Sequence, residues 1–153
     1  MPAIGGSTLV LVRLTARLTS GVLALLALLH VGWGCGSSVP FRSRRDLADA
    51  VVGSTAVPPP VACFAVAGAL TTGAVLVVDE ALLPPPLRRT ALVGMAGILG
   101  VRGVLGLAGR TALIAVGSDS DRFVRLDRRI YGPLCLGLSM GSLMATRRMS
   151  HRS

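Results

Sequence analysis

Residues 18–41 read LTSGVLALLALLHVGWGCGSSVPF and carry no charge unless His30 is protonated. A helix that crosses the hydrocarbon core of a membrane needs about 20 mostly apolar residues. This stretch is long enough, and Arg13 and Arg17 precede it as a basic flank. It therefore predicts a membrane span at about residues 16–36.

Three further runs have the length and composition of membrane spans. Residues 50–78 are uncharged, but the prolines at 58–60 cannot lie inside a helix, so the second span is expected at about residues 61–78. Residues 90–117 contain only two charges, Arg102 and Arg110, and predict a third span at about residues 91–113. The fourth span, at about residues 130–146, is only just long enough. The sequence thus predicts an all-α fold, a transmembrane four-helix bundle with short loops, as a single integral membrane domain over residues 1–153.

The composition points to the same class of protein. Of the 153 residues, 52% are hydrophobic and 15% are charged, whereas soluble domains carry about 25% charged residues. The formal net charge is +9, and the sixteen basic residues are all arginines that gather between the uncharged runs, as in the loops of membrane proteins. No nucleic-acid partner is expected, because no aromatic side chains interleave with these clusters. The expected partner is the lipid bilayer.

Four spans place both termini on one side of the membrane. The arginines outside the spans divide evenly between the two sides, so the positive-inside rule carries little information. Five of the seven acidic residues lie on the side away from the termini, which favours cytoplasmic termini in a multi-pass protein of the bacterial plasma membrane. A cleaved signal peptide is an alternative for the first run, although Trp33 beside Cys35 suits neither cleavage nor lipid attachment.

Glycine occupies every third position from residue 94 to residue 109. Collagen is excluded because the intervening residues are not rich in proline and six triplets are too few. On a helix these glycines form a groove without side chains that winds around the axis. Membrane helices associate through close packing at small residues, so a neighbouring helix can approach along such a groove. Small residues four apart recur in the second and fourth runs, at Ala65, Ala69 and Gly73 and at Gly137 and Gly141. A tightly packed bundle is therefore expected.

Two polar side chains are predicted at membrane depth. Arg102 lies about twelve residues into the third span, near the bilayer centre, where a cation costs at least about 2.5 to 3.5 kcal/mol. It is therefore expected to face the bundle interior or water. His30 lies at a similar depth, and its neutral imidazole can accept a hydrogen bond from the guanidinium. We predict a polar centre of His30, Trp33 and Arg102; the alternatives are that Arg102 snorkels or binds backbone carbonyls and that His30 bonds a carbonyl.

The three cysteines are predicted near one membrane face. Cys35 ends the first span, and Cys63 and Cys135 begin the second and fourth. No spaced cysteine or histidine motif accompanies them, so neither a metal nor another cofactor is expected. Buried, inert thiols are the simplest interpretation, with a disulfide between Cys35 and Cys63 as the alternative.

The charged third loop is a candidate interface. Asp127 is a candidate counter-ion for Arg110 or Arg129, and the candidate loop or interface residues are Asp127, Arg129, Tyr131 and Cys135. No second acid or base at a fixed distance is identifiable, and there is neither a nucleophile elbow nor a phosphate loop. No catalytic residue is therefore assigned.

Several short motifs together resemble a family of small bacterial four-span membrane proteins that is described only as a domain of unknown function. They are His30, Trp33, Gly34 and Gly36, then ADAVVG at residues 48–53, VRG at 101–103, Phe123, LDRR at 126–129, Tyr131 and PLC at 133–135. The resemblance covers nearly the whole chain. It implies an integral membrane protein with four helices, and it brings no known activity, substrate or catalytic residue.

Three functions remain open at this point. The first is a non-enzymatic membrane module that binds a small or lipid-like ligand or a partner protein, including a second copy of the chain. The second is a membrane redox protein that uses His30 and the cysteine face. The third is a small oligomeric transporter, although no inverted repeat is visible.

Overall fold

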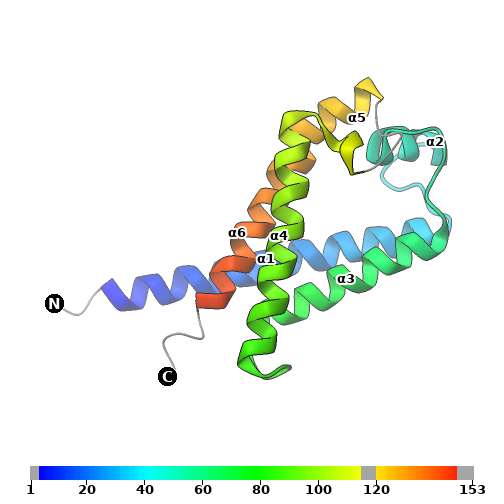
Figure 1. Ribbon diagram of the computed structural model, residues 1–153. Coiled ribbons are helices and arrows are strands. Elements are labelled where there is room, and N and C mark those ends of the chain that lie inside the picture. The colour runs from blue at the N-terminus through cyan, green and yellow to red at the C-terminus, as the bar shows by residue number, and fades with distance from the viewer. Residues whose placement is uncertain (1–3, 115–119, 148–153) are drawn as a thin grey trace.

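The computed structural model describes residues 4–114 and 120–147 and is all-α over these ranges, as predicted (Figure 1). The long helices are α1 (Ile4–Gly34), α3 (Pro60–Val78), α4 (Pro85–Ala108) and α6 (Gly132–Arg147). The short elements are α2 (Arg44–Leu47), the π-helical turn η1 (Ala48–Val52), the 3₁₀ turn η2 (Thr111–Leu113), α5 (Asp121–Leu126) and the π-helical turn η3 (Asp127–Tyr131).

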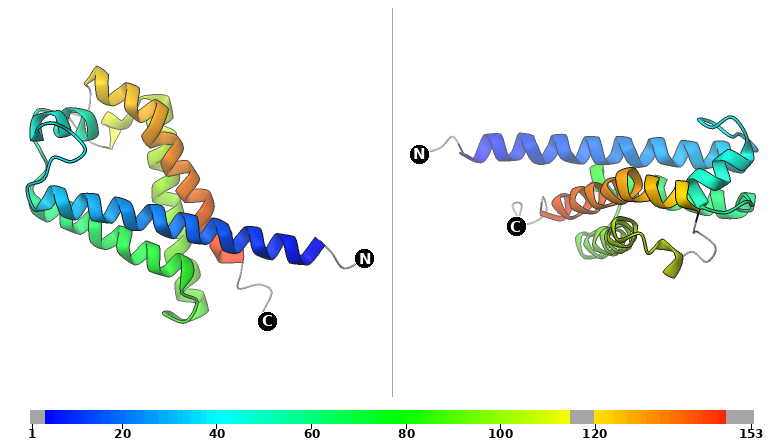
Figure 2. Two further views of the ribbon diagram at one scale, coloured as in Figure 1. Left: turned by 180° about the vertical axis from the view of Figure 1, so that it is seen from behind. Right: turned by 90° about the horizontal axis from the view of Figure 1, so that it is seen from above.

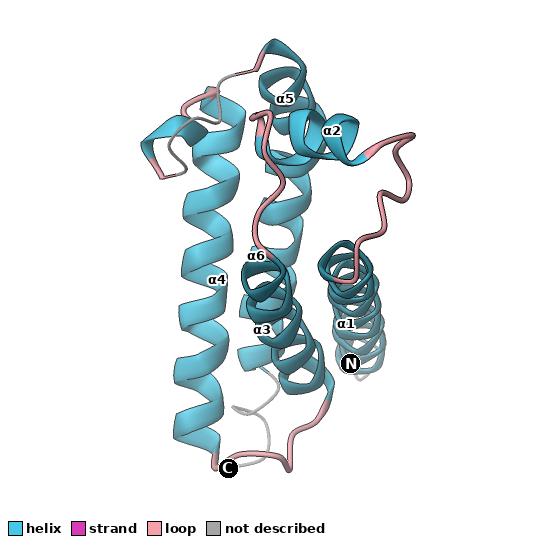
Figure 3. Ribbon diagram, turned by 90° about the vertical axis from the view of Figure 1, so that its right-hand side faces the viewer, coloured by secondary structure: helices cyan, strands magenta, loops and turns pink. Residues whose placement is uncertain are grey.

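The long helices form two hairpins. Helix α1 packs along α3, and α4 packs along α6. Figures 1 and 2 show that the two hairpins cross rather than run parallel, and α1 contacts α6 at the crossing. Elements α2, η1 and α5 lie on the open side of this fork, beyond the end of α3 and beside the ends of α4 and α6 (Figure 3). The helices are therefore arranged as two crossed hairpins.

Among the residues that the structure describes, three helical segments are long and apolar enough to cross a membrane, namely Val10–Gly34, Pro60–Val78 and Pro85–Ala108. The last of these segments, α4, begins and ends a few residues earlier in the sequence than the span expected at 91–113. It begins at Pro85 because proline suits the first turn of a helix. It ends at Ala108 because Gly109 adopts the left-handed conformation, with a φ of +66°.

The apolar core lies where the hairpins cross. Leu23 of α1, Val77 of α3 and Leu92 of α4 are fully buried there. Away from the crossing, large apolar side chains remain exposed on the long helices; Val61 and Ile98 are more than 70% exposed. So much uncovered apolar surface is rare on soluble monomers and suits contact with lipid.

The glycine series of α4 divides into two halves. Gly97 has open space where a Cβ atom would sit, as does Gly94. A Cβ on Gly103 would instead come within 2.9 Å of the carbonyl oxygen of Gly132 on α6. The packing interpretation therefore applies to the second half of the series, where added Cβ atoms would meet atoms of η3 and α6.

A buried arginine joins the two hairpins. Arg88 of α4 is 0% exposed, and its Nε donates to the carbonyl oxygens of Leu76 (2.9 Å) and Asp79 (3.1 Å), while Nη2 donates to that of Val77 (3.4 Å). Carbonyls at the carboxyl end of a helix lack partners within the helix and carry the negative end of its dipole. Arg88 thus caps α3 from the first turn of α4.

We expect Arg88→Met to lower the free energy of unfolding by about 2 kcal/mol, because it removes charge-assisted hydrogen bonds from buried carbonyls. The matched control is Arg89→Met, since Arg89 is exposed, and its effect should stay within about 0.5 kcal/mol. Unfolding by sodium dodecyl sulfate in mixed micelles, followed by circular dichroism, measures both. Equal losses from the two variants would contradict the capping role.

Candidate functional site

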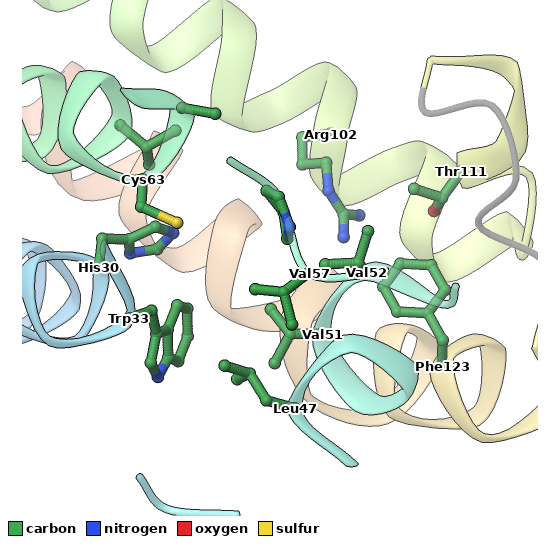
Figure 4. Close-up of a pocket in the computed structure, with 13 residues that line it drawn as sticks. His30, Trp33, Leu47, Val51, Val52, Val57, Cys63, Arg102, Thr111 and Phe123 are labelled. Carbon is green, nitrogen blue, oxygen red and sulfur yellow. The ribbon is translucent and has the colours of Figure 1, made fainter. Parts of the chain in front are cut away.

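A pocket of about 260 Å³ lies in the fork between the hairpins (Figure 4). Elements far apart in the sequence line it, and its surface is mostly apolar, with apolar side chains from α2, η1, the loop before α3 and α3 itself. Its polar side chains gather at two ends. His30 belongs to one end, and Arg102 and Thr111 belong to the other.

The first end contains His30, Trp33 and Cys63. The His30 and Trp33 ring centroids are 4.8 Å apart and the ring planes are inclined by 56°. His30 Nδ1 lies 2.7 Å from the carbonyl oxygen of Leu26. Because a carbonyl can only accept, Nδ1 is the donor in this contact, and in the corresponding uncharged tautomer Nε2 is an acceptor. The indole Nε1 of Trp33 donates to the carbonyl oxygen of Val39 (2.7 Å), which holds the loop after α1 against the ring.

The second end contains Arg102, Thr111 and Phe123. The Arg102 guanidinium points into the pocket and lies 5.9 Å from the centre of the Phe123 ring, within the range of a cation–π contact. Its Nη1 is 2.8 Å from Oδ1 of Asp127 and 3.1 Å from Oδ2. The Thr111 hydroxyl also donates to Oδ2. Since the Asp127 side chain is 1% exposed and that of Arg102 is 25% exposed, the carboxylate holds the guanidinium in place from behind the pocket wall.

Three expectations about these charges are corrected. Asp127 pairs with Arg102 rather than with Arg110 or Arg129, because η3 lies beside the last turns of α4, whereas Arg110 and Arg129 are exposed. Arg102 lies six residues before the end of α4 rather than near the middle of a span. The guanidinium donates to Asp127 and not to His30, whose ring bonds its own helix. His30 and Arg102 nevertheless line one pocket, at opposite ends of it.

The other candidate residues are dispersed. The Tyr131 hydroxyl donates to the carbonyl oxygen of Ala50 (3.1 Å) and so joins η3 to η1. All three cysteines are free thiols: Cys35 is exposed, Cys63 is buried and lines the pocket, and Cys135 is partly buried. In residues 4–114 and 120–147, no group of three or more His, Cys, Asp or Glu side chains could hold a metal ion.

Segment η1 bridges the fork, a contact that the sequence did not predict. Ser120 donates through Oγ to the carbonyl oxygen of Asp49 (3.2 Å) and through its backbone N–H to that of Gly53 (3.3 Å). Arg122 lies 3.5 Å from the Asp49 carboxylate. These contacts hold η1 against α5, while Leu47 just before it packs with Trp33 of α1. Leu47 and Thr111 were missed as lining residues, because neither lies in a periodic segment or carries a charge.

The comparisons with known proteins identify a family but no activity. Neither a curated protein nor a solved structure matches the chain. The family model described as "Protein of unknown function (DUF3995)" matches residues 23–142, a range that includes both ends of the pocket and confirms the resemblance to a domain of unknown function. The chain therefore belongs to this family of proteins of unknown function.

Proposed function

We propose that the protein is a non-enzymatic binding module of the bacterial plasma membrane that takes a small, mostly apolar molecule into the pocket between its hairpins. In this proposal the chain crosses the membrane several times with both termini in the cytoplasm. The pocket carries the proposal: at about 260 Å³ it lies just below the range of about 300 to 1,000 Å³ typical of ligand sites. Apolar walls with a few placed polar groups are also typical of such sites.

The ion pair behind the pocket supports a ligand-binding role. Burying a salt bridge contributes little net stability, because desolvation offsets the attraction between the charges. Apolar side chains would pack α4 against η3 equally well. Ionisable residues in apolar helices are costly and mark functional sites. Arg102 keeps a quarter of its side chain exposed on the pocket side of this pair, where it is available to a ligand.

The pocket contains its own spectroscopic reporter. Trp33 is the only tryptophan of the chain and lines the pocket. Bromobenzene quenches indole fluorescence on contact and has no polar group of its own. Binding in the pocket is expected to give saturable quenching of the full-length protein in detergent, on top of the linear quenching that any micelle produces.

We expect Ala62→Phe to weaken this binding at least tenfold, because Ala62 lines the pocket and the added ring fills it. Ala65→Phe is the matched control, since Ala65 lies on the same helix, is exposed and does not line the pocket. It should bind bromobenzene as the unaltered protein does. Circular dichroism and thermal unfolding verify that both variants are folded. Linear quenching of the same slope in all three proteins would reject the binding function.

A further inference from the structure

We infer that the pocket selects a neutral aromatic molecule that carries a hydroxyl group at one end and a hydrogen-bond acceptor, such as a carbonyl oxygen, at the other. This inference rests on the proposed function, because it names the ligand class of the same pocket. It is carried by the hydrogen-bonding character of the polar atoms at the two ends.

The His30 end of the pocket favours a ligand with a hydrogen-bond donor. Nδ1 donates to the carbonyl oxygen of Leu26 at 2.7 Å, and in this uncharged tautomer the other ring nitrogen, Nε2, carries a lone pair. His30 lines the pocket, and a ligand without a donor would leave this lone pair unsatisfied against an apolar surface, which is costly. A hydroxyl group satisfies it.

The Arg102 end of the pocket favours a ligand with an uncharged hydrogen-bond acceptor. A guanidinium has five N–H donors in a fixed fork, and one of them, on Nη1, donates to Oδ2 of Asp127. The charge of the cation is already balanced by a carboxylate that is 1% exposed. A ligand carboxylate would place a second anion beside this buried one, and like charges at short distance are unfavourable. A carbonyl oxygen accepts from the guanidinium without this repulsion.

The walls favour a flat ring between the two polar groups. Trp33 lies at the His30 end and Phe123 at the Arg102 end, with valine side chains between them (Figure 4). Aromatic rings pack well against other rings in offset or edge-to-face arrangements. A volume of about 260 Å³ accommodates one substituted ring rather than a long acyl chain.

Three probes of nearly equal size separate the possible ligand chemistries. The probe para-hydroxyacetophenone has both the hydroxyl and the carbonyl, acetophenone lacks the hydroxyl, and para-hydroxybenzoate replaces the carbonyl by an anion. Titration calorimetry of the full-length protein in nanodiscs, near neutral pH, measures their affinities. We expect the first probe to bind about five- to tenfold more tightly than acetophenone, which is the effect of one additional hydrogen bond. Para-hydroxybenzoate is expected to bind more weakly than para-hydroxyacetophenone.

The variant His30→Phe tests the contact itself, because it keeps a ring and removes the acceptor. It should bind para-hydroxyacetophenone and acetophenone equally. Val31→Phe is the matched control, since Val31 is 40% exposed and does not line the pocket, and it should keep the preference. A preference that survives in a folded His30→Phe protein would overturn the assignment of the hydroxyl to His30. If that variant does not fold, the affinities of the three probes for the unaltered protein test the ligand class without it.

The remaining outcomes distinguish the ligand class from the proposed function. Saturable bromobenzene quenching without any preference among the three probes would overturn the ligand class and leave the binding function intact. Tightest binding of para-hydroxybenzoate would show an anion site and would overturn the requirement for neutrality. Absence of binding by all four probes would overturn both.

Discussion

Arg102→Met is expected to lower the free energy of unfolding by about 3 to 5 kcal/mol, because it leaves the carboxylate of Asp127 buried without its cation. That carboxylate is 1% exposed, and the Thr111 hydroxyl would be its remaining side-chain donor among the contacts described above. Unfolding by sodium dodecyl sulfate in mixed micelles measures the loss. A change below about 1 kcal/mol would contradict the description of this pair as buried and interdependent.

A double variant separates the stabilising role of the pair from its role in binding. Arg102→Met combined with Asp127→Asn removes both charges, and the asparagine amide oxygen can still accept from Thr111. Because a buried ion pair contributes little net stability, the double variant should recover most of the stability lost in Arg102→Met. It should not recover the affinity for para-hydroxyacetophenone, since the donor to the carbonyl oxygen is gone. Recovery of both properties would show that Arg102 has only a structural role.

The second large effect is expected at Gly103, where α4 packs directly against α6. A Cβ atom there would lie 2.7 Å from Cγ of Leu136 and 2.9 Å from the carbonyl oxygen of Gly132. The leucine side chain can rotate, but the backbone carbonyl cannot, so the helices must separate. We expect Gly103→Ala to lower the free energy of unfolding by about 3 kcal/mol, at the upper end of the usual cost of overpacking.

The same helix provides the control for this substitution. Gly97 has open space at the Cβ position, so Gly97→Ala adds no clash and gains helix propensity of up to about 1 kcal/mol. The two alanine variants should therefore shift the sodium dodecyl sulfate midpoint in opposite directions. Shifts of equal size and sign would show that the spacing of the glycines, rather than their contacts, determines the effect.

The first two apolar helices could be predicted because a long uncharged run of this composition is typical of a membrane helix and of few soluble structures. The start of α4 could not be predicted, because Arg88 and Arg89 interrupt the apolar run and basic residues commonly lie outside membrane spans. Arg88 instead lies inside the helix, where carbonyls of α3 take its hydrogen bonds. A sequence shows that such a residue is charged. It does not show which groups offset the free-energy cost of burying that charge, because those groups depend on how two helices pack together.

The candidate site was predictable in part for a similar reason. His30 and Arg102 could be singled out because polar side chains are rare in apolar helices, and both line the pocket. The partner of Arg102 lies 25 residues away in the chain, beyond a change of direction. Nothing in the spacing indicates that η3 brings Asp127 back beside α4, and the pairing follows only from the fold.

In the membrane arrangement proposed above, the unequal lengths of α1 and α3, 31 against 19 residues, would make the first hairpin sensitive to bilayer thickness. At 1.5 Å per residue, α3 spans about 28 Å and matches a hydrocarbon core of about 30 Å, whereas α1 spans about 46 Å. Because the two helices pack together, α1 cannot tilt alone to absorb its excess length. Arg13 and Arg17, four residues apart on the exposed side of α1, are therefore expected to lie where this helix would leave the hydrocarbon. A thicker membrane would place these two cations inside the hydrocarbon, which is unfavourable. Hydrophobic mismatch would therefore restrict the hairpin to membranes below a certain thickness.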